Sequence, residues 1–140
     1  MTIQTYQNKK LQVQQNKIIN NIYASNNLST YKRNGLLRFM DSSNYFGAIK
    51  LYKEINNSVV PYFSDKISGL QSNHNYPTRF SENHNIVPPR FRKSKCQSSF
   101  IYQSISFWNT LPVEIKLSNN VKQFKRKLKS FIVSSYQENS

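Results

Sequence analysis

Two stretches in the second half of the chain combine cations with aromatic rings in a pattern that suits nucleic acid. They read RFRKSKCQSSFIYQ (residues 90–103) and KQFKRKLKSF (residues 122–131). Cations neutralise phosphates and release counterions, and aromatic rings stack on unpaired bases. Together with Tyr76 and Arg79 in the segment before them, these stretches contain the nine cations that we expect to contact phosphate and the two rings that we expect to stack: Arg79, Arg90, Arg92, Lys93, Lys95, Lys122, Lys125, Arg126 and Lys129, with Tyr76 and Phe91.

The charge balance points in the same direction. The 140 residues include 20 lysines and arginines against 6 acids, which gives a net charge of +14. Such an excess favours a polyanion or an anionic membrane surface over an acidic small substrate. The alternative is a basic protein whose charges only form a solvated surface and whose aromatic residues only form its core.

Residues suited to catalysis are missing or scattered. Two-metal sites need clustered carboxylates, whereas the six acids here stand singly along the chain. Glycine occurs only three times, so there is no glycine-rich phosphate loop. His74, His84 and Cys96 fit no short zinc spacing, and neither histidine has an obvious carboxylate to orient it towards Cys96. We expect no catalytic residue, no metal site and no cofactor.

The elements that must position the basic residues are mostly helices. In residues 8–23, Leu11, Ile18, Ile19 and Ile22 fall on one helical stripe. The spacing predicts a second, short helix within residues 28–40, interrupted near Asn34-Gly35. A third helix is predicted over residues 44–56, with Asp41 or Ser42 as its cap. Its apolar positions are Tyr45, Phe46, Ile49, Tyr52 and Ile55.

The second half predicts one amphipathic helix and one hinge. Residues 119–136 carry an apolar stripe at helical spacing, with Ser118 as the predicted cap. The block SISFWNTLPVEIK (residues 104–116) predicts two short segments separated by Pro112, which cannot continue a helix. We interpret this block and the helix after it as a structural motif that fixes the basic segments: Trp108, Leu111, Pro112, Ile115, Phe124 and Leu128.

The predicted fold class is mainly α. We expect a single small domain of short helices with an irregular central loop and room for one small β-hairpin near residues 90–103. Residues 1–70 would form an N-terminal helical segment, residues 71–89 a polar loop, and residues 90–140 the basic segment and the amphipathic helix.

The sequence also predicts a location inside the cell, in the cytoplasm or nucleus. Cys96 is the only cysteine, so no intramolecular disulfide can form. The first twenty residues contain no apolar run typical of a secretory signal, and no stretch approaches the roughly 18 apolar residues of a spanning helix. We therefore expect no membrane partner.

Four boxes in a fixed order resemble the C-terminal tail of reverse transcriptases from non-LTR retrotransposons of the LINE type (jockey- and CR1-like). They are HNYPTR (residues 74–79), PRFR (residues 89–92), WNTLPVEI (residues 108–115) and FKRKLK (residues 124–129). The segments LQVQQNKIINNIY (residues 11–23) and LYKEINNSVVPYFSD (residues 51–65) also resemble this tail. The resemblance therefore spans nearly the whole chain.

The resemblance implies a role beside a polymerase core, holding template RNA or target DNA. The paired aspartates of the family's polymerase domain are missing here, so we expect no polymerase activity from this chain and interpret it as a truncated or fragmentary copy. Pro77 and the Ser104-Ile105-Ser106 run depart from the family pattern. Alternatives are an accessory part of an RNA-directed DNA polymerase whose core is supplied upstream or in trans, a protein-interaction module, or a relic without function.

Overall fold

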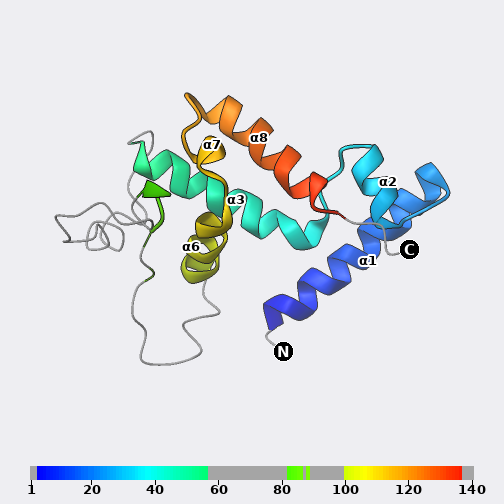
Figure 1. The fold of residues 1–140 in the computed structure, drawn as a ribbon. Coiled ribbons are helices and arrows are strands. Elements are labelled where there is room, and N and C mark those ends of the chain that lie inside the picture. The colour runs from blue at the N-terminus through cyan, green and yellow to red at the C-terminus, as the bar shows by residue number, and fades with distance from the viewer. Residues whose placement is uncertain (1–2, 57–81, 87, 89–99, 137–140) are drawn as a thin grey trace. The chain divides into compact units, whose positions relative to one another are not determined.

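The structure, a computed structural model, describes residues 3–56, 82–86, 88 and 100–136. Within these ranges the chain forms six α-helices and no strand, which confirms the mainly α fold (Figure 1). Most of the expected hairpin lies outside the described residues, and its last part, residues 100–103, is helical. The chain divides into unit 1, residues 1–43 with 126–140, and unit 2, residues 44–125, which we describe separately.

Unit 1 begins with α1 (Ile3–Tyr23) and the short α2 (Leu28–Arg33). Asn27 caps α2, since its side-chain oxygen accepts the Thr30 N–H at 2.9 Å. Gly35 ends the helix at a φ of +60°, where a residue without Cβ is least strained. The Leu36 N–H donates to the Tyr31 carbonyl at 2.8 Å, and the Gly35 N–H donates to the Lys32 carbonyl. These two hydrogen bonds form a Schellman motif. The expected turn at Asn34-Gly35 is therefore present.

The start of α3 (Phe39–Ile55) is capped by side chains distant in sequence. Gln15 Oε1 accepts the Phe39 N–H at 2.8 Å, and Gln12 Oε1 accepts the Met40 N–H at 3.0 Å. The Tyr136 hydroxyl accepts the Arg38 N–H at 3.0 Å. These bonds satisfy N–H groups that have no partner within the helix.

The local cap predicted for this helix was wrong. The helix begins at Phe39, upstream of both expected capping residues. Ser42 instead donates to the Phe39 carbonyl at 2.6 Å, and Asp41 accepts a hydrogen bond from the Tyr136 hydroxyl, also at 2.6 Å. Glutamines of α1 take the place of a local cap because they reach N–H groups that these two side chains do not serve.

The apolar stripe predicted for α1 is mostly on its surface. Leu11, Ile18 and Ile22 are 47%, 58% and 64% exposed, whereas Ile19 is buried together with the polar Gln12. Gln12 Nε2 donates to Asn16 Oδ1 at 2.9 Å and lies 3.3 Å from the Tyr31 hydroxyl. The helix therefore turns an amide-rich face inward, because those amides cap α3 and bond Tyr31.

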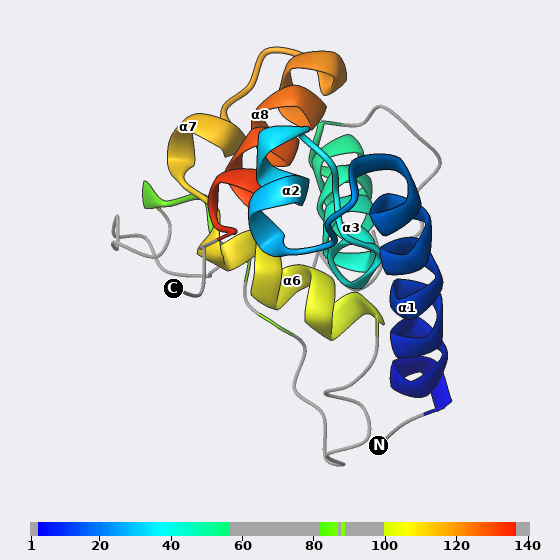
Figure 2. The ribbon, with the colours of Figure 1, turned by 90° about the vertical axis from the view of Figure 1, so that its right-hand side faces the viewer.

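Unit 2 is built where α6 (Phe100–Thr110) crosses α3, as the two views in Figures 1 and 2 show. The crossing depends on Gly47, which is buried in α3. A Cβ at this position would lie 2.1 Å from Ser104 Oγ and 2.9 Å from Ser104 Cβ. Any larger residue would therefore push the two helices apart.

Aromatic rings fill the core of unit 2. The Tyr52 ring stacks on Phe124 with centroids 4.3 Å apart, and Trp108 lies 5.9 Å from Phe124 at a tilt. The Tyr52 hydroxyl donates to the Ser118 carbonyl. Ile105 and Trp108, three residues apart on α6, are both buried.

The hinge after α6 follows the prediction. The helix ends at Thr110, and α7 (Val113–Lys116) begins after Pro112, which precedes it at a φ of −59°. The last helix, α8 (Val121–Ser134), has a different cap from the one expected. Asn120 Oδ1 accepts the Gln123 N–H at 2.8 Å, whereas Ser118 is buried and donates to the Ile115 carbonyl.

Candidate nucleic-acid interface

A hollow of about 520 Å³ in unit 2 combines aromatic rings with cations. Helix α3 provides most of its wall, α6 contributes one ring and α8 contributes one lysine. We call it the basic-aromatic groove and define it by its lining residues: Tyr45, Phe46, Ile49, Lys50, Lys53, Phe100 and Lys125.

The groove offers ring surface to solvent. Phe46 is 61% exposed and Phe100 is 42% exposed, although large apolar side chains are usually covered. Tyr45 meets Phe46 edge to face, with centroids 5.3 Å apart and planes at 73°. The Tyr45 phenol, whose pKa burial raises above its already alkaline ordinary value, is uncharged at neutral pH and does not repel an anion. Exposed rings beside one another are suited to stacking on unpaired bases.

Three lysines provide the positive charge of the groove. Lys50 and Lys53 follow Phe46 on α3 at positions i+4 and i+7, so the helix repeat places them on the side of that ring. Lys125 reaches the same hollow from α8 and is exposed. Lysines around a ring platform match a strand that turns its bases to the rings and its phosphates to the ammonium groups.

The structure brings one of the predicted site residues into this groove, namely Lys125. Lys122, Arg126 and Lys129 are exposed on α8 but do not line the groove, and Arg126 and Lys129 belong to unit 1. The other seven predicted contacts lie outside the described residues: Tyr76, Arg79, Arg90, Phe91, Arg92, Lys93 and Lys95.

Sequence reasoning missed the α3 side of the groove. It assigned Tyr45 and Phe46 to a helical apolar stripe with Ile49, yet Phe46 is the most exposed of the three. The usable signal was the spacing of Phe46, Lys50 and Lys53, because a ring followed by cations at i+4 and i+7 lies on a charged side of a helix.

The predicted structural motif holds a short neighbouring segment of unit 2. Trp108 Nε1 donates to the His84 carbonyl at 3.0 Å. Asn109 pairs with both backbone groups of Ile86, since its Oδ1 accepts the N–H and its Nδ2 donates to the carbonyl, each at 2.8 Å. The Asn109 amide thus pairs with Ile86 as the backbone of a neighbouring strand would, and Trp108 holds the same segment at His84.

The Lys116 ammonium reinforces this clamp from α7. Its side chain is buried, and its ammonium donates to the Asn83 carbonyl at 2.8 Å and to Asn85 Oδ1 at 2.6 Å. The nitrogen also lies 5.8 Å from the centre of the Trp108 ring. Burial lowers the pKa of Lys116, because it removes water that would stabilise the charged form.

Most of the remaining motif residues are buried as well. In unit 2, Leu111, Ile115 and Phe124 are buried and Pro112 is partly covered at the hinge, and Leu128 is buried in unit 1. The motif is therefore occupied in packing and in holding residues 83–86. The close approach of α6 to α3 at Gly47 and Ser104 brings Phe100 to the groove.

Comparisons with protein-family models, with curated proteins and with solved structures find no match to this chain. Among the described residues, no helix is long and apolar enough to cross a membrane. Within the same ranges, no three His, Cys, Asp or Glu side chains gather as in a metal site.

Proposed function

We propose that this chain is a non-catalytic nucleic-acid-binding module and that the basic-aromatic groove holds a single strand. The observation that carries the proposal is the pair of exposed rings, Phe46 and Phe100, in one hollow with Lys50, Lys53 and Lys125. Base stacking contributes about 1–3 kcal/mol per base and tolerates any sequence. Single-stranded or structured RNA is therefore the preferred ligand, ahead of duplex DNA, whose bases are already stacked.

We further propose that the module descends from the tail of a non-LTR retrotransposon reverse transcriptase. The support is the order of the boxes, from HNYPTR to FKRKLK, together with the net charge of +14. In that setting the chain would act inside the cell, in the cytoplasm or nucleus, beside a polymerase core. The core would carry the catalytic residues and this chain would carry none.

The rival in which the stripe of Phe124, Leu128 and Phe131 docks onto another protein is disfavoured. Phe131 is partly exposed, whereas Phe124 and Leu128 have a relative exposure of 0% and are part of the chain's own core. A partner could reach them only by opening that core, at a cost of several kcal/mol.

The test is binding of a labelled single-stranded RNA, measured by fluorescence anisotropy for the full chain and for Phe46→Ala. Losing one stacked base should weaken binding about 5- to 150-fold, equivalent to about 1–3 kcal/mol. Tyr6→Ala is the matched control, because Tyr6 is also aromatic, is 63% exposed and lies outside the groove. Equal affinities for Phe46→Ala and the parent chain would reject the groove as the binding site.

A further inference from the structure

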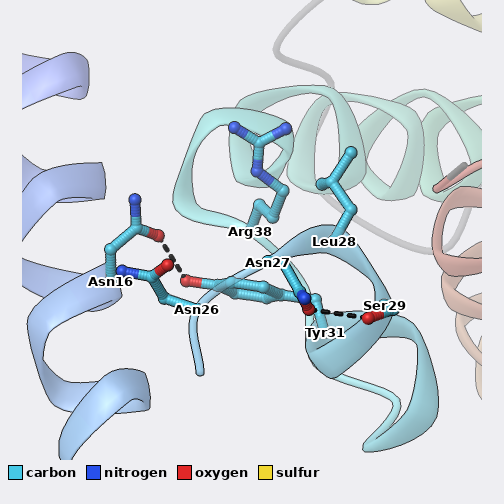
Figure 3. Close-up of a pocket in the computed structure, with 7 residues that line it drawn as sticks. All are labelled: Asn16, Asn26, Asn27, Leu28, Ser29, Tyr31 and Arg38. Carbon is cyan, nitrogen blue, oxygen red and sulfur yellow. Dashed lines mark hydrogen bonds between the residues drawn. The ribbon is translucent and has the colours of Figure 1, made fainter. Parts of the chain in front are cut away.

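Unit 1 contains a second hollow of about 450 Å³, and its chemistry differs from that of the groove. Three asparagines, a serine and a tyrosine line it, with one arginine and one leucine. We call it the amide pocket and define it by its lining residues: Asn16, Asn26, Asn27, Leu28, Ser29, Tyr31 and Arg38 (Figure 3).

Hydrogen bonds within unit 1 leave mainly donors for a ligand. Asn16 Oδ1 already accepts from the Tyr31 hydroxyl at 2.8 Å and from Gln12 at 2.9 Å. Asn27 Oδ1 accepts from the Ser29 hydroxyl at 2.7 Å and from the Thr30 N–H at 2.9 Å. Both side-chain oxygens are thus occupied, so among the described residues the two amides offer a ligand their NH₂ groups, which can only donate.

Arg38 adds a positive charge to these donors. Its side chain is partly buried, and within the described part of the chain its guanidinium has no hydrogen bond and no ion pair. Figure 3 shows it on the same side of the Tyr31 ring as Leu28, with the Tyr31 hydroxyl beside Asn16 and Asn26. A partly desolvated cation whose head group is not hydrogen-bonded is stabilised by an anion that bonds it.

From these donors we propose that the amide pocket binds a phosphate group, and specifically the terminal phosphate of a nucleotide. A doubly charged phosphate offers several acceptor oxygens, which match the Arg38 fork and the amide NH₂ groups of Asn16 and Asn27. The volume is within the range of small-ligand sites and leaves room for the nucleoside beside Leu28. This site is independent of the groove, so either could fail alone.

The experiment titrates the full ¹⁵N-labelled chain with inorganic phosphate, uridine 5′-monophosphate and uridine, and follows amide chemical shifts by NMR. Inorganic phosphate and the monophosphate should shift signals around Asn16, Asn27 and Arg38, whereas uridine should bind at least tenfold more weakly. Comparing a 5′-phosphorylated RNA with its 5′-hydroxyl form tests whether the phosphate that binds in the pocket is the end of an RNA strand. Stronger pocket shifts from the phosphorylated RNA would assign the strand end, and equal shifts would assign the free nucleotide.

Two variants remove the proposed recognition without removing the fold. Arg38→Gln deletes the charge, and Asn27→Asp keeps an oxygen that caps α2 while placing a negative charge where the NH₂ group stood. Each should weaken phosphate binding at least tenfold with a circular-dichroism melt like that of the parent. Arg33→Gln is the matched control, because it removes the same charge from an exposed position outside the pocket.

The proposal is overturned if neither phosphate nor the monophosphate shifts those signals, or if uridine binds as well as the monophosphate. It is also overturned if Arg33→Gln weakens binding as much as Arg38→Gln. Phe46→Ala should leave the titration unchanged, so a failure of the groove and a failure of the pocket give different results.

Discussion

The two units are held together by different physical means. Unit 2 is organised around stacked rings, with Phe124 between Tyr52 and Trp108. Unit 1 buries the amide of Gln12 and the phenols of Tyr31 and Tyr136 among hydrogen bonds that also cap α3. Apolar patterning can therefore locate one kind of core and miss the other, because polar side chains are stable inside when every group has a partner.

The largest expected effect is loss of the aromatic core. Phe124→Ala should destabilise the fold by about 3–5 kcal/mol, because it removes a buried ring that touches two others and leaves a cavity. Chemical denaturation followed by Trp108 fluorescence measures this loss. Phe46→Ala, at an exposed ring, should change stability by less than about 1 kcal/mol. Similar losses for the two variants would contradict the assigned core.

A second prediction tests the polar interior of unit 1. Gln12→Leu keeps bulk and adds apolar surface, yet it should cost about 1–3 kcal/mol. It leaves the Met40 N–H and the Asn16 oxygen without one of their partners. Gln14→Leu is the matched control on the exposed side of α1, where no such cost is expected. Urea denaturation followed by far-UV circular dichroism measures both, and a more stable Gln12→Leu chain would refute the polar-core interpretation.

Alkaline pH should act through Tyr136 of unit 1 and Lys116 of unit 2 with opposite signs. Burial and the hydrogen bond to Asp41 raise the pKa of the Tyr136 phenol, so the folded chain keeps a proton that the unfolded chain loses above about pH 10. Stability should fall there. Burial lowers the pKa of Lys116 from 10.5, so the unfolded chain holds more protons below that pH and stability should rise towards it.

Tyr31 and Tyr45 also contribute to the pH dependence of stability, because burial raises the pKa of each phenol. Single substitutions therefore separate the contributions of Tyr136 and Lys116. Tyr136→Phe should flatten the decline above pH 10, and Lys116→Met should remove the rise below it. Thermal melts between pH 8 and pH 11 give both curves. If neither curve differs from that of the parent, the two groups do not titrate as their burial implies.

The smallest expected effect concerns the surface of α1. Ile18→Gln should change stability by at most about 0.5 kcal/mol, because the side chain is 58% exposed, whereas the neighbouring Ile19→Ala should cost about 2–4 kcal/mol. Parallel urea melts compare the two. Equal losses of stability would mean that Ile18 is buried like Ile19, as the apolar stripe predicted from the sequence requires.

These contrasts explain how far the sequence could predict the molecule. The α6 and α8 apolar positions, the break at Pro112 and the turn at Gly35 could be predicted, because each depends on local periodicity or local backbone freedom. The buried face of α1 could not, because it depends on Gln12 and Gln15 reaching backbone N–H groups more than twenty residues away.

The candidate site shows the same limit. Lys125 was predicted from its basic segment, but Phe46 and Phe100 become neighbours only because Gly47 lets α6 cross α3 closely. A contact between helices separated by more than forty residues has no signature in the spacing of either helix.

The most direct test of the groove is the salt dependence of single-stranded RNA binding in the full chain. With about six phosphates contacted, log K should fall with log salt at a slope near −4 to −5, and Lys50→Gln with Lys53→Gln should flatten it by about 1.4. The matched control, Lys9→Gln with Lys10→Gln, removes the same charge from exposed positions on α1 and should leave the slope unchanged. A slope near zero for the parent chain, or equal flattening by both pairs, would contradict nucleic-acid binding through the groove.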